Sequence, residues 1–130
     1  MLKLRTIAMA IVLTLAPAAS ALAAEVRAFE EAAFAAAQAQ GRPILIAVKA
    51  WWCPVCSSQG RSIRQITTAA DYNSLVIFNV NYDKQKQVLR RFAVTRQATL
   101  IGFNGTRQTG RLDFVTDRAR IGALLAATLR

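Results

Sequence analysis

The stretch that decides the fold is Ile44-Leu-Ile-Ala-Val-Lys-Ala-Trp-Trp-Cys-Pro-Val-Cys56, which joins an apolar run to a closely spaced pair of cysteines. Residues 44–48 are apolar and rich in branched side chains, which is typical of a strand buried on both faces of a sheet. Residues 57–66 carry isoleucines spaced to face a core from one side of a helix. Cys53 and Cys56 therefore lie where a core strand turns into a helix.

Helices and strands alternate on both sides of this stretch. Residues 29–40 are rich in strong helix formers and stop at Gly41, a residue that commonly ends a helix. Residues 75–82 form a second apolar strand, and we expect Asp83 to cap the helix that follows it. Up to this point the pattern predicts a helix, a strand, a helix, a strand and a helix.

The last third of the chain predicts an antiparallel hairpin followed by a helix. Residues 99–103 and 111–115 are the two strands, and Asn104-Gly105 between them tolerates the backbone angles of a tight turn. Thr116 or Asp117 then caps a helix whose large apolar residues form one stripe. With crossovers of the usual right hand, this order gives an α/β fold in which helices flank both faces of a central mixed sheet.

The first 23 residues have the features of a secretory signal peptide. Basic residues precede an almost wholly apolar run from Ile7 to Leu15, and Ala21-Leu22-Ala23 supplies the pattern at which signal peptidases cut. We therefore expect a signal peptide over residues 1–23, a single domain over residues 24–130, and export to a bacterial periplasm. The alternative is an uncleaved membrane anchor. No later segment has the roughly 20 apolar residues that membrane insertion needs.

The chain is strongly basic, with 17 Lys and Arg against 7 Asp and Glu, which gives a formal net charge of +10. Removal of Lys3 and Arg5 with the signal leaves 15 basic residues against the same 7 acids, a net charge of +8. The arginines are spread over several predicted elements, and export makes nucleic acid an unsuitable partner. We therefore expect no nucleic-acid partner, and a charge that attracts acidic partners or an anionic surface.

The cysteine pair has the spacing and position of a redox site. At the start of a helix, unpaired backbone N–H groups and the helix dipole stabilise a thiolate, so we expect the pKa of Cys53 to lie below about 8.5, the value of a free thiol. Cys56 lies one helical turn further along, where it can attack a mixed disulfide formed on Cys53. We assign Cys53 as the nucleophile and Cys56 as the resolving thiol of dithiol/disulfide exchange.

Three other roles for this pair are open. A purely structural disulfide would close so short a loop that it stabilises the fold by only about 2 kcal/mol, against roughly 4 to 5 for a long loop. A zinc or iron–sulfur site would need a homodimer, because one chain has 2 cysteines and no histidine. A redox-inert binding module would keep its function without the thiol of Cys53. We favour thiol exchange, and for one chain we expect no metal and no cofactor.

Taken together, the apolar strand, Ala50-Trp51-Trp52 and Cys-Pro-Val-Cys resemble the thioredoxin superfamily. Phe29-Glu-Glu-Ala, the alanine-rich helix and Gly41-Arg42-Pro43 are similar to the thioredoxin-like C-terminal domain of periplasmic thiol:disulfide interchange reductases, over nearly the whole mature chain. The resemblance implies a thioredoxin-like fold, protein thiols and disulfides as partners, and a membrane protein as electron donor. It favours a reductase over an oxidase.

The resemblance also implies a set of substrate-binding residues around the cysteines. Trp52 and Pro54 would contact partners beside the nucleophile, and Gln97-Ala98-Thr99 would form the edge that pairs with an extended segment of the partner. Trp51 is an extra aromatic residue, which we interpret as packing in the core or at its rim.

Three positions depart from the family pattern. Ala98 stands where thioredoxins have a cis-proline, and a cis bond before a non-proline residue costs about 2.5 to 4 kcal/mol, so we expect a trans Gln97–Ala98 bond and a reshaped docking edge. Ala47 and Asn79 stand where the family has a buried acid and its accompanying lysine. Cys56 must then lose its proton to water, to the helix field or to the substrate, and we expect slower exchange than in a typical thioredoxin.

Overall fold

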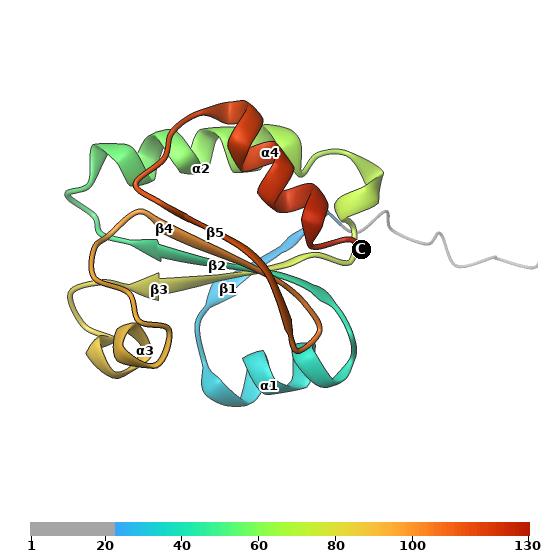
Figure 1. Cartoon of the computed structure of the whole chain (residues 1–130), viewed down its shortest axis with the longest axis horizontal. Helices are drawn as coiled ribbons and strands as arrows, with labels where there is room; N and C mark the ends of the chain where they lie inside the picture. The colour runs from blue at the N-terminus through green and yellow to red at the C-terminus, as the bar shows by residue number, and fades with distance from the viewer. Residues whose placement is uncertain (1–22) are drawn as a thin grey trace, which may run out of the picture.

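The computed structural model describes residues 23–130, which form a five-stranded sheet with helices on both faces (Figure 1). The strands are β1 (Glu25–Ala28), β2 (Pro43–Lys49), β3 (Val76–Asn81), β4 (Thr99–Asn104) and β5 (Arg107–Asp113). The helices are α1 (Glu31–Ala39), α2 (Pro54–Ile66), α3 (Lys86–Arg91) and α4 (Arg118–Ala127), with a 3-10 turn, η1, at Ala70–Tyr72. Except for Ala23, the predicted signal peptide lies outside the described residues. Among the described helices, none has the length and apolar character needed to cross a membrane.

The sheet has the order β1-β3-β2-β4-β5, and its pairing is mixed. β2 runs parallel to β3, with Ala47 opposite Asn79, and antiparallel to β4. β4 and β5 form the predicted antiparallel hairpin. The predicted α/β fold with a central mixed sheet is confirmed. β1 is an additional strand that the sequence pattern did not predict, and it pairs parallel to β3 at the edge of the sheet.

Two apolar cores lie on opposite faces of the sheet. One face is covered by α1 and α3 and contains a set of aromatic rings, of which Phe34 contacts four others at centroid distances of 5.5 to 5.9 Å. The other face is covered by α2 and α4, whose Ile63 and Ile121 pack against Leu45 and Leu100 of the sheet. This second core fixes α2, and with it the cysteine pair, against the end of β2.

Helix ends agree with the predictions in two places and differ in a third. Gly41 follows α1 with a φ of +66°, the left-handed conformation that glycine adopts without strain. Asp117 caps α4, because its carboxylate accepts a hydrogen bond from the backbone N–H of Arg120. The prediction that Asp83 caps the following helix is wrong. α3 begins later, after Gln85, and has no side-chain cap.

The hairpin turn also lies one residue later than predicted. Asn104 still belongs to β4, and the two turn residues are Gly105 and Thr106. The hairpin also contains a register shift between Gly102 and Phe103. Gly105 has a φ of +57°, so it supplies the positive backbone angle that the turn requires.

Candidate active site

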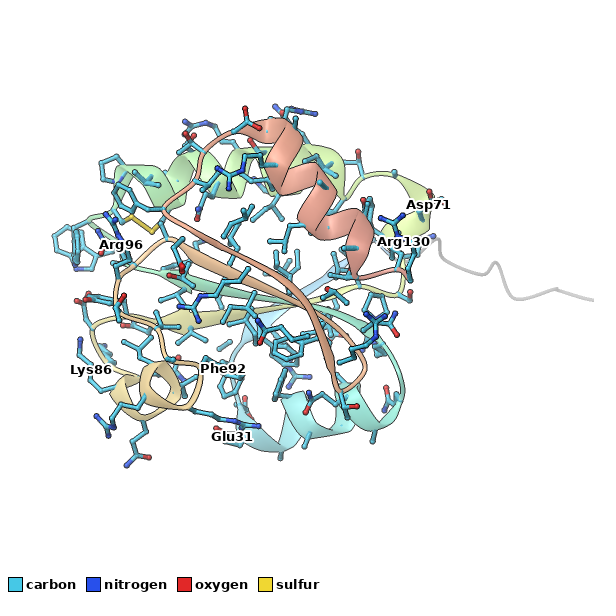
Figure 2. The ribbon with its side chains drawn as sticks, viewed as in Figure 1. Glu31, Asp71, Lys86, Phe92, Arg96 and Arg130 are labelled. Carbon is cyan, nitrogen blue, oxygen red and sulfur yellow. A yellow bond between two sulfur atoms is a disulfide. The ribbon has the colours of Figure 1, made fainter. Side chains whose placement is uncertain are left out.

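The two cysteines lie at the N-terminal end of α2, where they are joined by a disulfide with a Cα–Cα distance of 5.3 Å (Figure 2). Cys53 is the N-cap residue of the helix, and Pro54 occupies its first turn. Proline is favourable there, because the backbone N–H that it lacks would have no partner inside the helix. The backbone N–H of Cys56 donates a hydrogen bond to Sγ of Cys53 over 3.1 Å.

The disulfide is almost completely covered. Cys53 and Cys56 are each 2% exposed, and they pack with Ala98. Half-buried side chains, Tyr82 and Phe114 among them, lie against this cluster. A partner sulfur can therefore reach the disulfide only after part of this cover moves.

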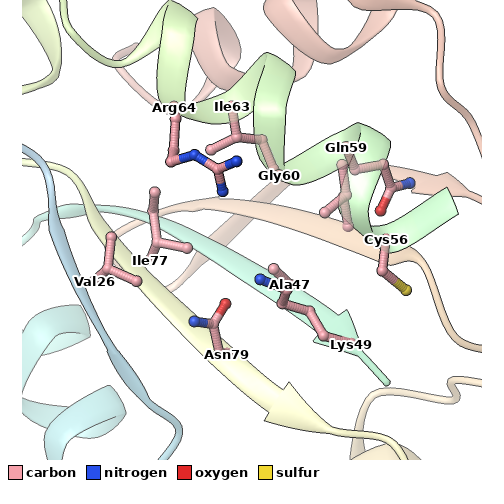
Figure 3. Close-up of a pocket in the computed structure, with 11 residues that line it drawn as sticks. Val26, Ala47, Lys49, Cys56, Gln59, Gly60, Ile63, Arg64, Ile77 and Asn79 are labelled. Carbon is pink, nitrogen blue, oxygen red and sulfur yellow. The ribbon is translucent and has the colours of Figure 1, made fainter. Parts of the chain in front are cut away.

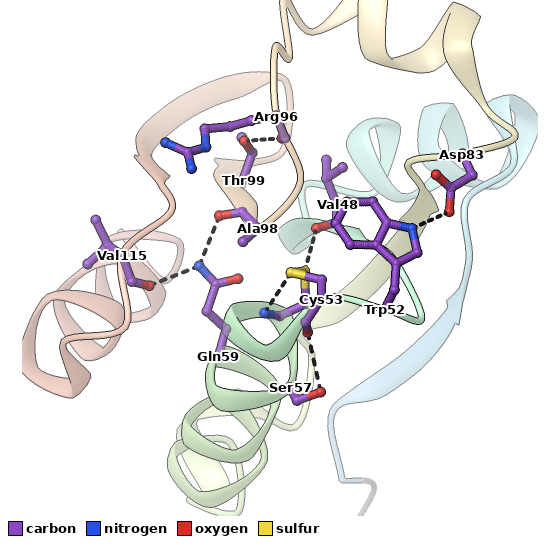
Figure 4. Close-up of a disulfide and its surroundings, with 11 residues drawn as sticks. Val48, Trp52, Cys53, Ser57, Gln59, Asp83, Arg96, Ala98, Thr99 and Val115 are labelled. Carbon is purple, nitrogen blue, oxygen red and sulfur yellow. Dashed lines mark hydrogen bonds between the residues drawn. A yellow bond between two sulfur atoms is a disulfide. The ribbon is translucent and has the colours of Figure 1, made fainter.

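The loop that leads into β4 passes directly beside the cysteines (Figure 4). The expected trans bond between Gln97 and Ala98 is confirmed, because residues 23–130 contain no cis peptide bond. Ala98 is fully buried with a φ of +59°, its N–H donates to the carbonyl of Val48, and its carbonyl accepts from the N–H of Phe114. Both backbone groups of Ala98 are thus already used inside the protein.

The other two residues of the predicted docking edge differ from each other. Thr99 is fully buried, and its hydroxyl donates to the carbonyl oxygen of Arg96 over 2.9 Å. Gln97 is half-buried, and its backbone makes no hydrogen bond to any other part of residues 23–130. The N–H and C=O of Gln97 are therefore the backbone groups of this edge that a partner can use.

Gln59 is a site residue that the sequence analysis missed. It is 2% exposed, and its side-chain Nε2 donates hydrogen bonds of 2.9 Å to the carbonyl oxygens of Ala98 and Val115. One amide thus ties α2 to the segments before β4 and before α4. A signal was present in the sequence, because Gln59 lies between Cys56 and Ile63 on the buried face of the helix, where a polar residue needs a partner.

The two tryptophans before the cysteines have different environments. Trp52 is 44% exposed, its Nε1 donates to Oδ2 of Asp83 over 3.0 Å, and its ring meets Tyr82 edge-on at 6.3 Å. Asp83 thus accepts a hydrogen bond from the indole of Trp52 and does not cap α3. Trp51 is 93% exposed, so the interpretation that it packs in the core or at the rim is wrong.

A cavity of about 100 Å³ lies beside Cys56, at the positions of the missing acid and lysine (Figure 3). Ala47 and Asn79 pair across β2 and β3, and both line this cavity. The cavity also contains the ends of Lys49 and Arg64, and no Asp or Glu among the described residues lines it. The cavity is large enough to hold water beside Cys56. Residues 23–130 contain no group of three or more His, Cys, Asp or Glu side chains placed to hold a metal ion.

Solved structures of other proteins share this fold. The chain is 36% identical to Trxlp from Edwardsiella tarda, with a TM-score of 0.75, over 78% of this chain and 98% of that one. A thioredoxin of Malassezia sympodialis matches at 16% identity and a TM-score of 0.69, over 82% of this chain and 91% of that one. Oxidised thioredoxin O2 of Arabidopsis thaliana matches at 20% identity and a TM-score of 0.65, over 83% of this chain and 96% of that one. The Malassezia and Arabidopsis matches show the fold alone. No protein-family model and no curated protein sequence matches the chain.

The fold and the site together define the class of protein. A cysteine pair at a strand-to-helix junction, buried against a loop at the end of the sheet, is the arrangement of a thiol:disulfide oxidoreductase. The Edwardsiella match, at 36% identity over 78% of the chain, is close enough to show the family. The chain belongs to the thioredoxin superfamily.

Proposed function

We propose that this protein is an exported, periplasmic thiol:disulfide oxidoreductase that acts on partner proteins, with Cys53 as nucleophile and Cys56 as resolving thiol. The observation that carries the proposal is the hydrogen bond from the N–H of Cys56 to Sγ of Cys53 at the start of α2. When the disulfide is reduced, the same donor and the helix dipole stabilise negative charge on Sγ of Cys53.

Reduction of a partner then proceeds in two exchange steps. The Cys53 thiolate attacks one sulfur of the partner's disulfide, and the partner's other sulfur leaves as a thiolate and takes up a proton from solvent. Cys56 loses its proton to water and attacks Sγ of Cys53, which releases the second partner thiol. Two electrons pass to the partner, and the protein ends in the disulfide state that the structure describes.

We place the partner's extended segment along Gln97, whose backbone has no hydrogen bond to any other described residue. Trp52 and Pro54 flank the same end of α2 and are exposed to a partner. Ala98 and Thr99 shape this edge from beneath, because both are fully buried. Docking must also move part of the cover over the cysteines, to which Phe114 and Tyr82 contribute.

The proposed direction and location rest on the sequence. The resemblance of the mature chain to the periplasmic interchange reductases supports a reductase that receives electrons from a membrane protein. The signal-like residues 1–23 support export. Expression of the full chain in a bacterium tests this: a shortened form in the periplasmic fraction is expected, and a full-length form in the membrane fraction would instead identify an anchor.

A redox titration tests the proposed chemistry. Anaerobically purified protein without residues 1–23 is equilibrated in dithiothreitol buffers, and its free thiols and metal content are measured on the same sample. We expect a metal-free monomer with one two-electron transition, at a potential nearer about −270 mV, as for a reductase, than about −120 mV, as for an oxidase. Bound iron or zinc without a reversible transition would overturn the proposal in favour of a metal-bridged dimer.

A further inference from the structure

Two cationic side chains meet beside the resolving cysteine without an acidic partner. Lys49 ends β2 and Arg64 lies on α2, and both reach toward Gly60 (Figure 3). A β-carbon on Gly60 would lie 4.0 Å from Nζ of Lys49 and 3.2 Å from Nη1 of Arg64. Neither cation forms a salt bridge with any described residue. Both line the cavity near Gly60, so two like charges lie close together there.

A groove of about 360 Å³ adjoins the cavity and shares lining residues with it. Lys49, Arg64 and Cys56 line both, so the groove leads directly past the redox site. Its outer part adds Arg61 on α2 and the 93% exposed Trp51. Three basic side chains and one exposed ring thus form a surface that we call the basic groove. No Asp or Glu of residues 23–130 lines it.

We propose that the basic groove binds a carboxylate side chain of the partner protein, and so selects thiol or disulfide partners with acidic residues close to the reacting cysteine. This rests on the proposed function, and it specifies which partners that function uses. A cleft lined by one sign of charge between low-dielectric walls concentrates ions of the opposite sign. A carboxylate that enters the groove interacts with two or three cationic side chains, and its negative charge offsets the repulsion between Lys49 and Arg64.

The position of the groove favours a carboxylate on the partner over a free small anion. Cys56 lines both the cavity and the groove, so a carboxylate bound there lies beside the cysteine pair. Trp51 extends the surface outward from the cavity, which gives a neighbouring partner side chain a flat apolar contact. A polypeptide uses both features at once, whereas a free anion uses only the cations.

The test compares disulfide peptides that differ only in the residues flanking one cysteine, with Glu-Glu, Gln-Gln or Lys-Lys there. The reduced protein reduces each peptide, and the rate constants are measured at low and at high salt. We expect the Glu-Glu peptide to react roughly tenfold faster than the Gln-Gln peptide at low salt, and the ratio to fall at high salt. The Lys-Lys peptide is expected to be the slowest.

Charge-neutral variants separate the groove from the overall positive charge. Lys49→Gln and Arg64→Gln, singly and together, are expected to lower the Glu-Glu to Gln-Gln ratio toward one. The matched control is Arg90→Gln on α3, which removes the same charge from an exposed residue that lines neither the cavity nor the groove and should keep the ratio. A ratio that falls equally in all variants would overturn the proposal, because net charge alone would then explain it.

Two further outcomes are distinguishable. If the wild-type protein reduces all three peptides at the same rate, the basic groove does not select acidic partners, but the proposed oxidoreductase function stands. If it reduces none of them, the proposed function itself fails. Acetate should lower the preference more than sodium chloride of equal ionic strength, because it competes with the peptide carboxylate for the same cations; an equal effect of the two salts would show general screening and would overturn the carboxylate site.

Discussion

Gln59 donates a hydrogen bond of 2.9 Å to the carbonyl oxygen of Ala98, which joins the helix carrying the cysteines to the loop on their other side. The same amide donates to the carbonyl of Val115. Because Gln59 is buried, its loss leaves the Val115 carbonyl without this donor and removes one of two donors to Ala98.

Gln59→Leu is therefore expected to lower the free energy of unfolding by about 1–3 kcal/mol, the cost of leaving buried polar groups unpaired. Urea unfolding measures this change. Gln87→Leu on α3 is the control, because Gln87 is exposed and makes no side-chain hydrogen bond among the described residues. An equal effect of both substitutions would show that the Gln59 hydrogen bonds contribute nothing specific.

Ala93 offers an opportunity for stabilisation. It follows α3 with a φ of +50°, while the N–H of Ala93 bonds to the carbonyl of Arg90 and the N–H of Val94 bonds to that of Leu89. This helix ending favours glycine, and an L-residue in the left-handed region costs roughly 1–2 kcal/mol. Ala93→Gly should raise the free energy of unfolding by about 0.5–1 kcal/mol, after the added chain entropy of glycine is subtracted.

Thermal or urea unfolding of Ala93→Gly and Ala35→Gly gives a matched comparison. Ala35 is exposed within α1, where the same substitution should destabilise the protein by about 1 kcal/mol. Destabilisation by both substitutions would contradict the strain assigned to Ala93.

Ala98→Pro is expected to destabilise the protein, although proline is the family's residue at that position. Proline fixes φ near −65°, whereas Ala98 has a φ of +59°, and proline removes the N–H that bonds to Val48. We expect a loss of about 3 kcal/mol in the free energy of unfolding. An unchanged urea midpoint would show that the loop accepts the usual family conformation at little cost.

The two cysteines should give different products when they are replaced singly. Cys53→Ser is expected to abolish turnover, because the residue at the helix N-cap supplies the attacking thiolate. Cys56→Ser should still attack a partner but accumulate the mixed disulfide, since no second thiol resolves it. Mass spectrometry of the unreduced reaction identifies the adduct. An adduct on Cys56 in the Cys53→Ser variant, at the wild-type rate, would reverse the assignment.

The ionisation of Tyr72 is expected to lower the free energy of unfolding at alkaline pH. Burial raises the pKa of Tyr72 above its ordinary value of 10.0, and the charge of Asp71 raises it further. The folded protein therefore keeps the proton at a pH where the unfolded chain has released it. This contribution to stability is complete below about pH 10 and is lost, by up to about 1.4 kcal/mol per pH unit, as the pH rises toward the folded pKa.

Tyr72→Phe keeps the ring and removes the proton, so its unfolding free energy should fall less than that of the wild type between about pH 8 and pH 11. Urea unfolding at several pH values measures the difference, with Tyr82→Phe as the control for loss of a hydroxyl. Parallel curves for the wild type and Tyr72→Phe would show that the burial of Tyr72 does not affect its proton.

Much of the framework around the cysteines could be predicted, because its signals are local and strong. β2 is a continuous apolar run, Asp117 has the chemistry of a cap, and Cys53-Pro54-Val55-Cys56 follows directly from the strand. β1 could not be predicted in this way. Its four residues are all exposed, and two of them are charged, so only pairing with β3 makes this segment a strand.

The parts of the site that were missed depend on partners distant in sequence. Asp83 has the same hydrogen-bonding chemistry for a cap and for the indole of Trp52, and local sequence does not choose between them. Phe114 has a φ of +58°, which a large side chain seldom adopts unless its surroundings impose it. Lys49 was assigned no role, because its relation to Arg64 exists only after α2 folds across the end of β2.

The cover over Cys53 and Cys56 has a consequence for how the protein's redox state is controlled. A small thiol in solution gains little by displacing Phe114, whereas a docked protein can offset that displacement with its other contacts. We therefore expect exchange with the general thiol pool to be slow relative to exchange with a bound partner. The balance between dithiol and disulfide would then follow the proteins that bind this one more closely than the compartment around it.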